Sequence, residues 1–182
     1  MGKNAICPYC IDEKPKFDLA RSIIRFDHNS EKLIHNFKYY DKTEAAKTLA
    51  QMMLKTYGQL IDNIDIITAI PMYKTKLQKR KYNQAAILAQ QIAKLCNKTY
   101  EPEILIKFKD SISQSGLTKD QRKENVKNTF KLNAKHKESI FRKNILLVDD
   151  VLTTGSTASE CTKVLKRNGI KRVHILTIAR TY

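Results

Sequence analysis

Short apolar segments along this chain are separated by stretches in which apolar residues recur at helical spacing. Residues 145–148 form a continuous run, Ile-Leu-Leu-Val, which is typical of a parallel strand covered on both faces. Ala46, Leu49, Ala50 and Met53 recur at intervals of three and four, which indicates a buried helix face. The same reasoning predicts strands at residues 65–70, 103–108 and 172–179, and helices at residues 30–37, 43–57, 83–96, 119–129 and 156–167.

The alternation of strands with helices predicts an α/β domain with a mostly parallel central sheet flanked by helices. A chain of 182 residues, of which 42% are hydrophobic, is long enough for one such domain. We assign residues 21–182 to this domain and the polar residues 1–20, which contain Cys7 and Cys10, to a short N-terminal extension. No apolar run is long enough to span a membrane and the N-terminus lacks the apolar stretch of a signal peptide, so we expect a cytoplasmic location.

Positive charge dominates the chain, with 34 basic against 18 acidic residues and a net charge of +16. A field of this kind attracts polyanions such as nucleotides, diphosphates and nucleic acid. Basic residues cluster at 74–81 and 119–143. Together with tyrosines such as Tyr73 and Tyr82, these clusters fit single-stranded DNA binding by charge and stacking. A lysine-rich surface without a specific ligand explains any one cluster equally well.

Two adjacent carboxylates follow the apolar run, and a turn of small polar residues comes directly after them. Asp149 and Asp150 are expected at the carboxyl end of the strand, where open α/β sheets bind their ligands. The turn opens the next helix, whose first N–H groups suit a phosphate, and Ser156 or Thr157 would cap that helix. Gly155 lets the backbone approach an anion closely. A ribose 5-phosphate satisfies both features, because its hydroxyls donate to the carboxylates while the turn holds the phosphate.

Residues 144–157 resemble the PRPP-binding motif of type I phosphoribosyltransferases, in which four apolar residues and an acidic pair precede a Thr/Gly/Ser turn. PRPP is the activated sugar phosphoribosyl diphosphate. An ordinary strand, turn and helix with two surface aspartates would explain the apolar run. It would not explain why an acidic pair is followed at once by Thr-Thr-Gly-Ser-Thr. We therefore favour a phosphosugar site.

Two further motifs extend the resemblance to the competence protein ComF family over residues 22–182. One is Arg-Lys-Tyr-Asn-Gln at residues 80–84. The other comprises Gln114, Leu117, Arg122, Asn125 and Phe130. Lys81 stands where the family usually has glycine, which argues against a tight glycine turn at that point.

The resemblance implies a type I phosphoribosyltransferase fold and a role for each motif. Asp149 and Asp150 would hold the ribose hydroxyls. The residues implied for the 5-phosphate are Val151, Thr153, Thr154, Gly155, Ser156 and Thr157. The residues implied for the diphosphate are Pro71, Met72 and Tyr73, with Lys76 and Arg80 as charged donors. Further implied binding positions are Asn83, Gln114, Arg122 and Asn125. Mg²⁺ would arrive with the diphosphate and keep several waters.

These implied positions also have simpler explanations. The basic residues after Pro71 would equally form a solvated loop, and Asn83 would equally cap a helix. Arg122 and Asn125, three residues apart, would equally lie on the surface of a salt-bridged helix.

Members of the ComF family are described as DNA-uptake proteins of natural transformation that bind single-stranded DNA. Their phosphoribosyltransferase domain follows an N-terminal zinc ribbon. The resemblance therefore implies three kinds of partner, namely PRPP or a related phosphosugar, single-stranded DNA, and DNA-uptake helicase or processing proteins. It also implies Zn²⁺ at Cys7 and Cys10, although tetrahedral zinc takes four ligands and this Cys-x-x-Cys supplies two.

Two functions stay open at this point. A phosphoribosyltransferase would displace diphosphate from PRPP with the nitrogen of a base or an amine. A DNA-uptake factor would use the same loop to sense a ligand or a DNA end. Thr153 stands where enzymes acting on 6-oxopurines usually carry aspartate, which argues against that class of acceptor.

Overall fold

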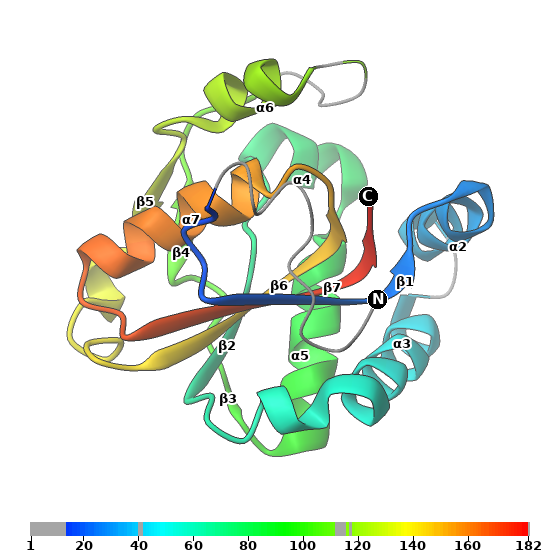
Figure 1. Ribbon diagram of the computed structural model, residues 1–182, viewed down its shortest axis with the longest axis horizontal. Helices are drawn as coiled ribbons and strands as arrows, with labels where there is room; N and C mark the ends of the chain where they lie inside the picture. Colours follow the sequence, from blue (N-terminus) through cyan, green and yellow to red (C-terminus); the bar gives the residue numbers. More distant parts are fainter. Residues whose placement is uncertain (1–13, 40–41, 112–115, 117, 182) are drawn as a thin grey trace.

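Five parallel strands form the central sheet of the part that the computed structural model describes, which is residues 14–39, 42–111, 116 and 118–181. Their spatial order is β1 (Leu19–Arg25), β7 (Arg172–Arg180), β6 (Asn144–Leu152), β2 (Ile66–Ala69) and β3 (Thr99–Tyr100). Every neighbouring pair in this order is parallel. Helices cover both faces of the sheet (Figure 1). The predicted α/β architecture with a mostly parallel sheet is confirmed.

Helices α3 (Lys42–Tyr57) and α5 (Gln84–Cys96) pack on one face of the sheet, and α7 (Ser156–Arg167) packs on the other. A two-stranded antiparallel ribbon of β4 (Leu105–Lys107) and β5 (Phe130–Leu132) lies on the α7 side. The remaining elements are α2 (His28–Tyr39), α4 (Lys74–Arg80), α6 (Lys119–Val126), η1 (Gly58–Leu60) and η2 (Ala134–His136). Among the described residues, no helix combines the length and apolar character needed to cross a membrane.

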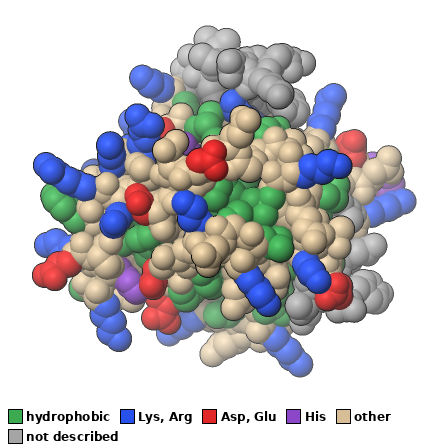
Figure 2. All heavy atoms as spheres, turned by 90° about the horizontal axis from the view of Figure 1, so that it is seen from below, with side chains coloured by type: hydrophobic (Ala, Val, Ile, Leu, Met, Phe, Trp, Pro, Cys, Tyr) green, Lys and Arg blue, Asp and Glu red, His purple; other side chains and the backbone are tan. Residues whose placement is uncertain are grey.

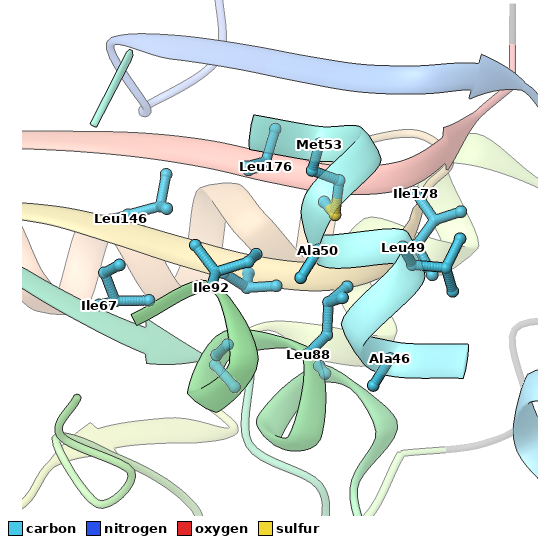
Figure 3. Packing of buried hydrophobic residues seen from close by; sticks show 14 of the residues in the cluster. Ala46, Leu49, Ala50, Met53, Ile67, Leu88, Ile92, Leu146, Leu176 and Ile178 are labelled. Atoms are coloured by element: carbon cyan, nitrogen blue, oxygen red, sulfur yellow. The ribbon is translucent and has the colours of Figure 1, made fainter. Parts of the chain in front are cut away.

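The alternating directions of side chains along β6 explain why the whole apolar run is buried. Leu146 and Val148 join the core cluster beneath α3 and α5, whereas Ile145 and Leu147 join the cluster beneath α7. Figure 3 shows the first cluster, in which side chains of α3 and α5 meet those of the sheet. The residues labelled there are Ala46, Leu49, Ala50, Met53, Ile67, Leu88, Ile92, Leu146, Leu176 and Ile178. Burial on both sheet faces holds β6 in a fixed register, and this fixes where its polar end emerges.

The hydrophobic pattern does not predict β1, β3, β5 or α4. All but the last residue of β1 are half-buried, so the strand shows no apolar alternation. Helix α4 buries no side chain at all, so helical spacing of apolar residues is missing. The predicted strand at 103–108 exists as β4 but pairs with β5 outside the parallel sheet. The predicted helix at 119–129 ends at Val126, because the chain then enters β5.

The residues just before β1 pack against the domain. The Phe17 ring is buried in the cluster beneath α7. Asp18 donates its backbone N–H to the Val173 carbonyl oxygen at 2.9 Å, and its carboxylate accepts the Val173 N–H at 2.7 Å. The carboxylate also lies 2.8 Å from the Lys166 Nζ atom. Within the segment assigned to an extension, residues 17–20 are therefore held by β7 and α7.

The chain reverses its direction across the sheet between β2 and β6. From β2 it continues outward to β3, whereas from β6 it continues to β7 and thus in the opposite direction. Ala69 lies opposite Val148, and the Ile70 N–H donates to the Val148 carbonyl oxygen at 2.9 Å. The segments after the two strands therefore leave the sheet side by side. In open α/β sheets such a switch point is where ligands bind.

Candidate phosphosugar site

A cavity of about 400 Å³ lies at this switch point, and we call it the strand-end cavity. The residues that the sequence predicts for a phosphosugar supply much of its wall. From β6 and the following turn these are Asp149, Asp150, Val151, Thr153, Gly155 and Thr157. From the segment after β2 these are Pro71, Met72, Tyr73, Lys76, Arg80 and Asn83. The structure thus brings together two motifs that are more than sixty residues apart in the sequence.

The acidic pair lies in the second half of β6 and is half-buried. The Asp149 Oδ1 atom accepts the backbone N–H of Asp150 at 2.9 Å, and the Asp150 Oδ1 atom accepts the N–H of Val151 at 2.7 Å. These local bonds restrict the two carboxylates. A carboxylate has about four acceptor sites, so each can accept several hydrogen bonds at once.

The turn after the acidic pair is built around Gly155. Its φ of +76° lies in the left-handed region, which other L-residues enter only with strain. Gly155 is itself the N-cap residue of α7, and no side chain caps the helix start. The prediction that Ser156 or Thr157 caps the helix is therefore wrong. The cause is local, because the Thr154 and Ser156 hydroxyls bond each other at 2.9 Å. A helix start without a side-chain cap is a favourable place for a phosphate.

The two sides of this turn face different spaces. Thr153 and Gly155 line the strand-end cavity and also a second cavity of about 400 Å³. Thr154 and Ser156 line only the second one. We call the second cavity the outer groove; its other walls are residues 14–17, part of α6, part of α7 and Arg180. The hydroxyls predicted for one phosphate are therefore divided between two spaces.

The segment after β2 is a helix rather than a solvated loop. Lys76 in α4 donates to the Ser111 carbonyl oxygen at 2.8 Å, and its Nζ atom lies 3.7 Å from the Asp110 carboxylate. Asn83 caps α5 by accepting the Ala85 N–H at 3.1 Å. Its amide also donates to the Ile70 carbonyl oxygen at 2.9 Å, which ties α5 to the end of β2. Asn83 therefore serves as a cap while it also lines the cavity.

Lys81 adopts the backbone conformation that glycine favours. It follows α4 with a φ of 64° and a ψ of −11° in the left-handed region. The departure from the family pattern at this position therefore does not remove the turn. The chain makes the turn with a lysine, at a cost of about 1–2 kcal/mol relative to an unstrained residue.

Sequence reasoning missed Lys107, which lines the strand-end cavity from β4. Its Nζ atom donates to the Ser111 Oγ atom at 2.6 Å and lies 5.4 Å from the centre of the Phe130 ring. Burial of the side chain lowers the pKa of its ammonium group, and the positive charge of Lys76 lowers that pKa further. A lysine inside the apolar run of residues 103–108 was the available signal.

Gln84 is a second cavity residue that sequence reasoning did not assign. Its side chain is only 2% exposed. Within the described part of the chain, its Nε2 atom is buried and has no hydrogen-bond partner. A buried amide without an acceptor is costly, so a ligand oxygen or an ordered water in the cavity would stabilise it.

Two further predicted residues do not line the strand-end cavity, and three others lie outside the described part of the chain. Arg122 and Asn125 lie on α6 and are absent from the cavity lining. Gln114, Cys7 and Cys10 lie outside the described residues. Over residues 14–39, 42–111, 116 and 118–181, no three histidine, cysteine or acidic side chains cluster as a metal site would require. The acidic pair at one wall still fits Mg²⁺ held mainly by ligand oxygens and water, which needs only one or two carboxylates.

Comparisons with known proteins agree with this geometry. Residues 39–181 match the family model of the phosphoribosyl transferase domain. Competence protein F of Haemophilus influenzae is 29% identical over 181 residues, which span 96% of this chain and 78% of that protein. DNA utilization protein YhgH of Escherichia coli is 26% identical over 182 residues, with the same two coverages.

Solved structures show the same fold. One is described as the allosteric regulatory enzyme of purine biosynthesis, and another is the glutamine PRPP amidotransferase of B. subtilis complexed with ADP and GMP. Each has a TM-score of 0.52 and 18% identity over 78% of this chain. The match spans only 29% and 30% of those chains, so it supports the type I phosphoribosyltransferase fold alone. The chain belongs to the phosphoribosyl transferase domain family, and its resemblance to the ComF competence proteins is confirmed.

Proposed function

We propose that the strand-end cavity binds PRPP or a related ribose 5-phosphate. One observation carries this proposal: Asp149, Asp150 and the Gly155 turn line one cavity at the switch point of the sheet. Ribose hydroxyls donate hydrogen bonds, which ionised carboxylates accept strongly. The 5-phosphate is an acceptor, which the backbone N–H groups of the turn and the α7 dipole suit.

The charges of the cavity fit an anionic ligand that brings its own cation. Glu31, Asp149 and Asp150 are balanced by Lys76, Arg80 and Lys107. We propose that the diphosphate lies toward Lys76 and Arg80, with Mg²⁺ shared between its oxygens and the acidic pair. The metal lowers the repulsion between the ligand anion and the carboxylates, and it would retain several waters.

For the whole protein, we propose a competence-related role in which this ligand site is combined with binding of single-stranded DNA. The net charge of +16 supports attraction of a polyanion. The similarity to proteins named Competence protein F and DNA utilization protein YhgH supports a role connected with DNA. Such a role would be carried out in the cytoplasm, with DNA-processing proteins as partners.

A transfer reaction is the second candidate function. Phe26 and Glu31 also line the cavity, although a phosphosugar does not require them. They supply an apolar face and a hydrogen-bond acceptor, which suit a nitrogenous acceptor. Release of diphosphate from PRPP on addition of a base or amine would support transfer. If PRPP binds but releases no diphosphate with any base or amine tested, binding alone would be the function.

Calorimetric titration of PRPP with Mg²⁺ tests the main proposal. Asp149→Asn/Asp150→Asn should lose about a hundredfold or more in affinity, because each substitution weakens a charge-assisted bond. Asp62→Asn/Glu138→Gln is the matched control, since it removes two negative charges from exposed positions outside the cavity. Equal affinity of the acidic-pair variant and the control would overturn the ribose contacts.

A further inference from the structure

The outer groove is a built concavity on the far side of the turn from the strand-end cavity. Besides the turn, four separate parts of the chain form it: residues 14–17, α6, α7 and the end of β7. In Figure 1 the segment before β1 passes α7, and α6 lies above the same helix. The groove is therefore a product of the tertiary fold and is invisible in any one sequence motif.

The groove is strongly positive. Its basic residues are Lys14, Lys16, Lys123, Lys127, Lys163 and Arg180. Its acidic residues are Glu124 and Glu160, which leaves a formal excess of four positive charges. Both acids already contact cations, since Lys127 lies 2.8 Å from Glu124 and Lys163 lies 3.5 Å from Glu160. Glu160 also accepts the Asn128 N–H at 3.0 Å.

The groove also has apolar and hydroxyl components. Pro15 contributes half-buried apolar surface, and the buried side chains of Phe17, Val126 and Leu152 lie beneath it. The mutually bonded hydroxyls of Thr154 and Ser156 form part of the wall. Cations around an apolar floor match a chain of phosphates joined by sugars, because the phosphates meet the cations while the sugar and base faces cover the floor.

We propose that the outer groove binds the phosphate backbone of single-stranded nucleic acid. This inference rests on the single-strand part of the proposed function and assigns it to a site. A second phosphosugar is a poorer match, because both carboxylates of the groove are engaged by lysines. A duplex is also a poorer match, because proteins read duplexes by inserting an element into a DNA groove, whereas here the protein surface is concave.

Positive charge is arranged differently on another face of the molecule and in the strand-end cavity. Figure 2 shows a face on which Lys and Arg side chains are spread around the periphery, with hydrophobic side chains exposed between them. The strand-end cavity, by contrast, is formally neutral. Among the cavities described here, the outer groove alone combines concavity with a large positive excess.

Anisotropy of a labelled oligo-dT strand, titrated with the full chain over a range of salt concentrations, tests the inference. The groove variant is Lys16→Gln/Lys123→Gln/Lys163→Gln. The matched control is Lys55→Gln/Lys94→Gln/Lys135→Gln, which removes the same charge from exposed positions outside both cavities. We expect the groove variant to lose at least about tenfold in affinity and the salt slope to fall by about 2, since each single-strand phosphate contact contributes about 0.7.

Several outcomes would overturn the inference. One is an equal loss in the groove variant and the control. Another is equally tight binding of inorganic triphosphate in the groove, which would make it a site for small anions. A third is a duplex of the same length that binds the wild type as tightly as oligo-dT does and loses as much affinity in the groove variant. PRPP titration of the groove variant should match that of the wild type, so a failure of the groove and a failure of the strand-end cavity are distinguishable.

Discussion

The strand-end cavity and the outer groove share one turn but differ in charge and in construction. Thr153, Gly155 and Leu152 line both spaces. On one side Glu31 and the acidic pair balance three cations, whereas on the other side six basic residues face two engaged acids. The first suits a small ligand with hydroxyls, phosphates and its own metal ion. The second suits an extended polyanion. A single loop can therefore separate two kinds of phosphate recognition, because its two faces present different atoms.

Substitution of Gly155, which both spaces share, should give the largest combined loss of PRPP and oligo-dT affinity. Gly155→Ala puts a Cβ atom 3.5 Å from the Phe17 ring, which is an ordinary contact, so strain from the positive φ is the main cost. That strain is about 1–2 kcal/mol, and the turn would shift to relieve it. We expect PRPP affinity to fall about tenfold or more and oligo-dT affinity to fall less.

Gly58→Ala is the matched control for the glycine substitution. A Cβ atom added to Gly58 meets nothing within 4 Å, and its φ is not in the left-handed region. Titration of both ligands into both variants would check the prediction. Unchanged PRPP affinity in Gly155→Ala would mean that the turn does not hold the phosphate.

The next largest effect is a difference in pH dependence between PRPP binding in the strand-end cavity and oligo-dT binding in the outer groove. The lowered pKa of Lys107 means that its ammonium loses its proton at a lower pH than an ordinary lysine. Rising pH therefore removes positive charge from the strand-end cavity first, and PRPP affinity should fall by about tenfold, the typical value of one charged hydrogen bond. Oligo-dT affinity should stay flat over the same range, because Lys107 lines the strand-end cavity and not the outer groove.

Variants of Lys107 make this prediction specific. Lys107→Arg keeps the charge at high pH, so its PRPP affinity should not fall as pH rises. Lys107→Met should bind weakly at every pH, whereas Lys143→Met, at an exposed position outside the cavity, should behave as the wild type. A wild-type pH profile in Lys107→Arg would show that another group titrates.

Most of the central fold could be predicted from the sequence, because burial on both faces leaves a readable trace. The apolar run of β6 and the helical spacing of α5 and α7 are examples. Strand β1 and helix α4 could not be predicted, because half-buried or unburied residues carry no periodic pattern. An apolar run also does not specify its partner, which is why β4 could not be assigned to the antiparallel ribbon.

The candidate site was predictable where it follows one rule of topology. Carboxyl ends of neighbouring parallel strands meet, so Pro71 and Asp149 could be placed together before any coordinates. Lys107 and Gln84 could not be placed there from the sequence, since their positions at the cavity depend on the β4–β5 ribbon and on the packing of α5. The outer groove had only a partial signal in the sequence, the basic cluster at 119–143, because the groove joins residue 14 to residue 180 through the tertiary fold.

A ligand bound in one space should lower the affinity of the other space for its own ligand by a small factor. Two anionic ligands in spaces that share Leu152, Thr153 and Gly155 repel each other, and two unit charges held about 10 Å apart in water would repel by about 0.4 kcal/mol. We expect saturating oligo-dT to weaken PRPP binding about twofold at low salt and not at high salt. Linkage requires PRPP to weaken oligo-dT by the same factor. The triple groove variant should lose this effect, and strengthened binding would indicate a change in the turn instead of charge repulsion.

The smallest predicted effect concerns the turn after α4. It changes stability and leaves the affinities for PRPP and oligo-dT unchanged. Lys81→Gly should raise the free energy of unfolding by up to about 1 kcal/mol, because glycine adopts a positive φ without the Cβ penalty. Lys81→Ala removes the same charge but keeps the Cβ atom, so it should bring no such gain. Denaturant unfolding of the two variants would measure the difference. If alanine stabilised the protein as much as glycine, loss of charge in this basic segment would be the cause, and backbone strain would not.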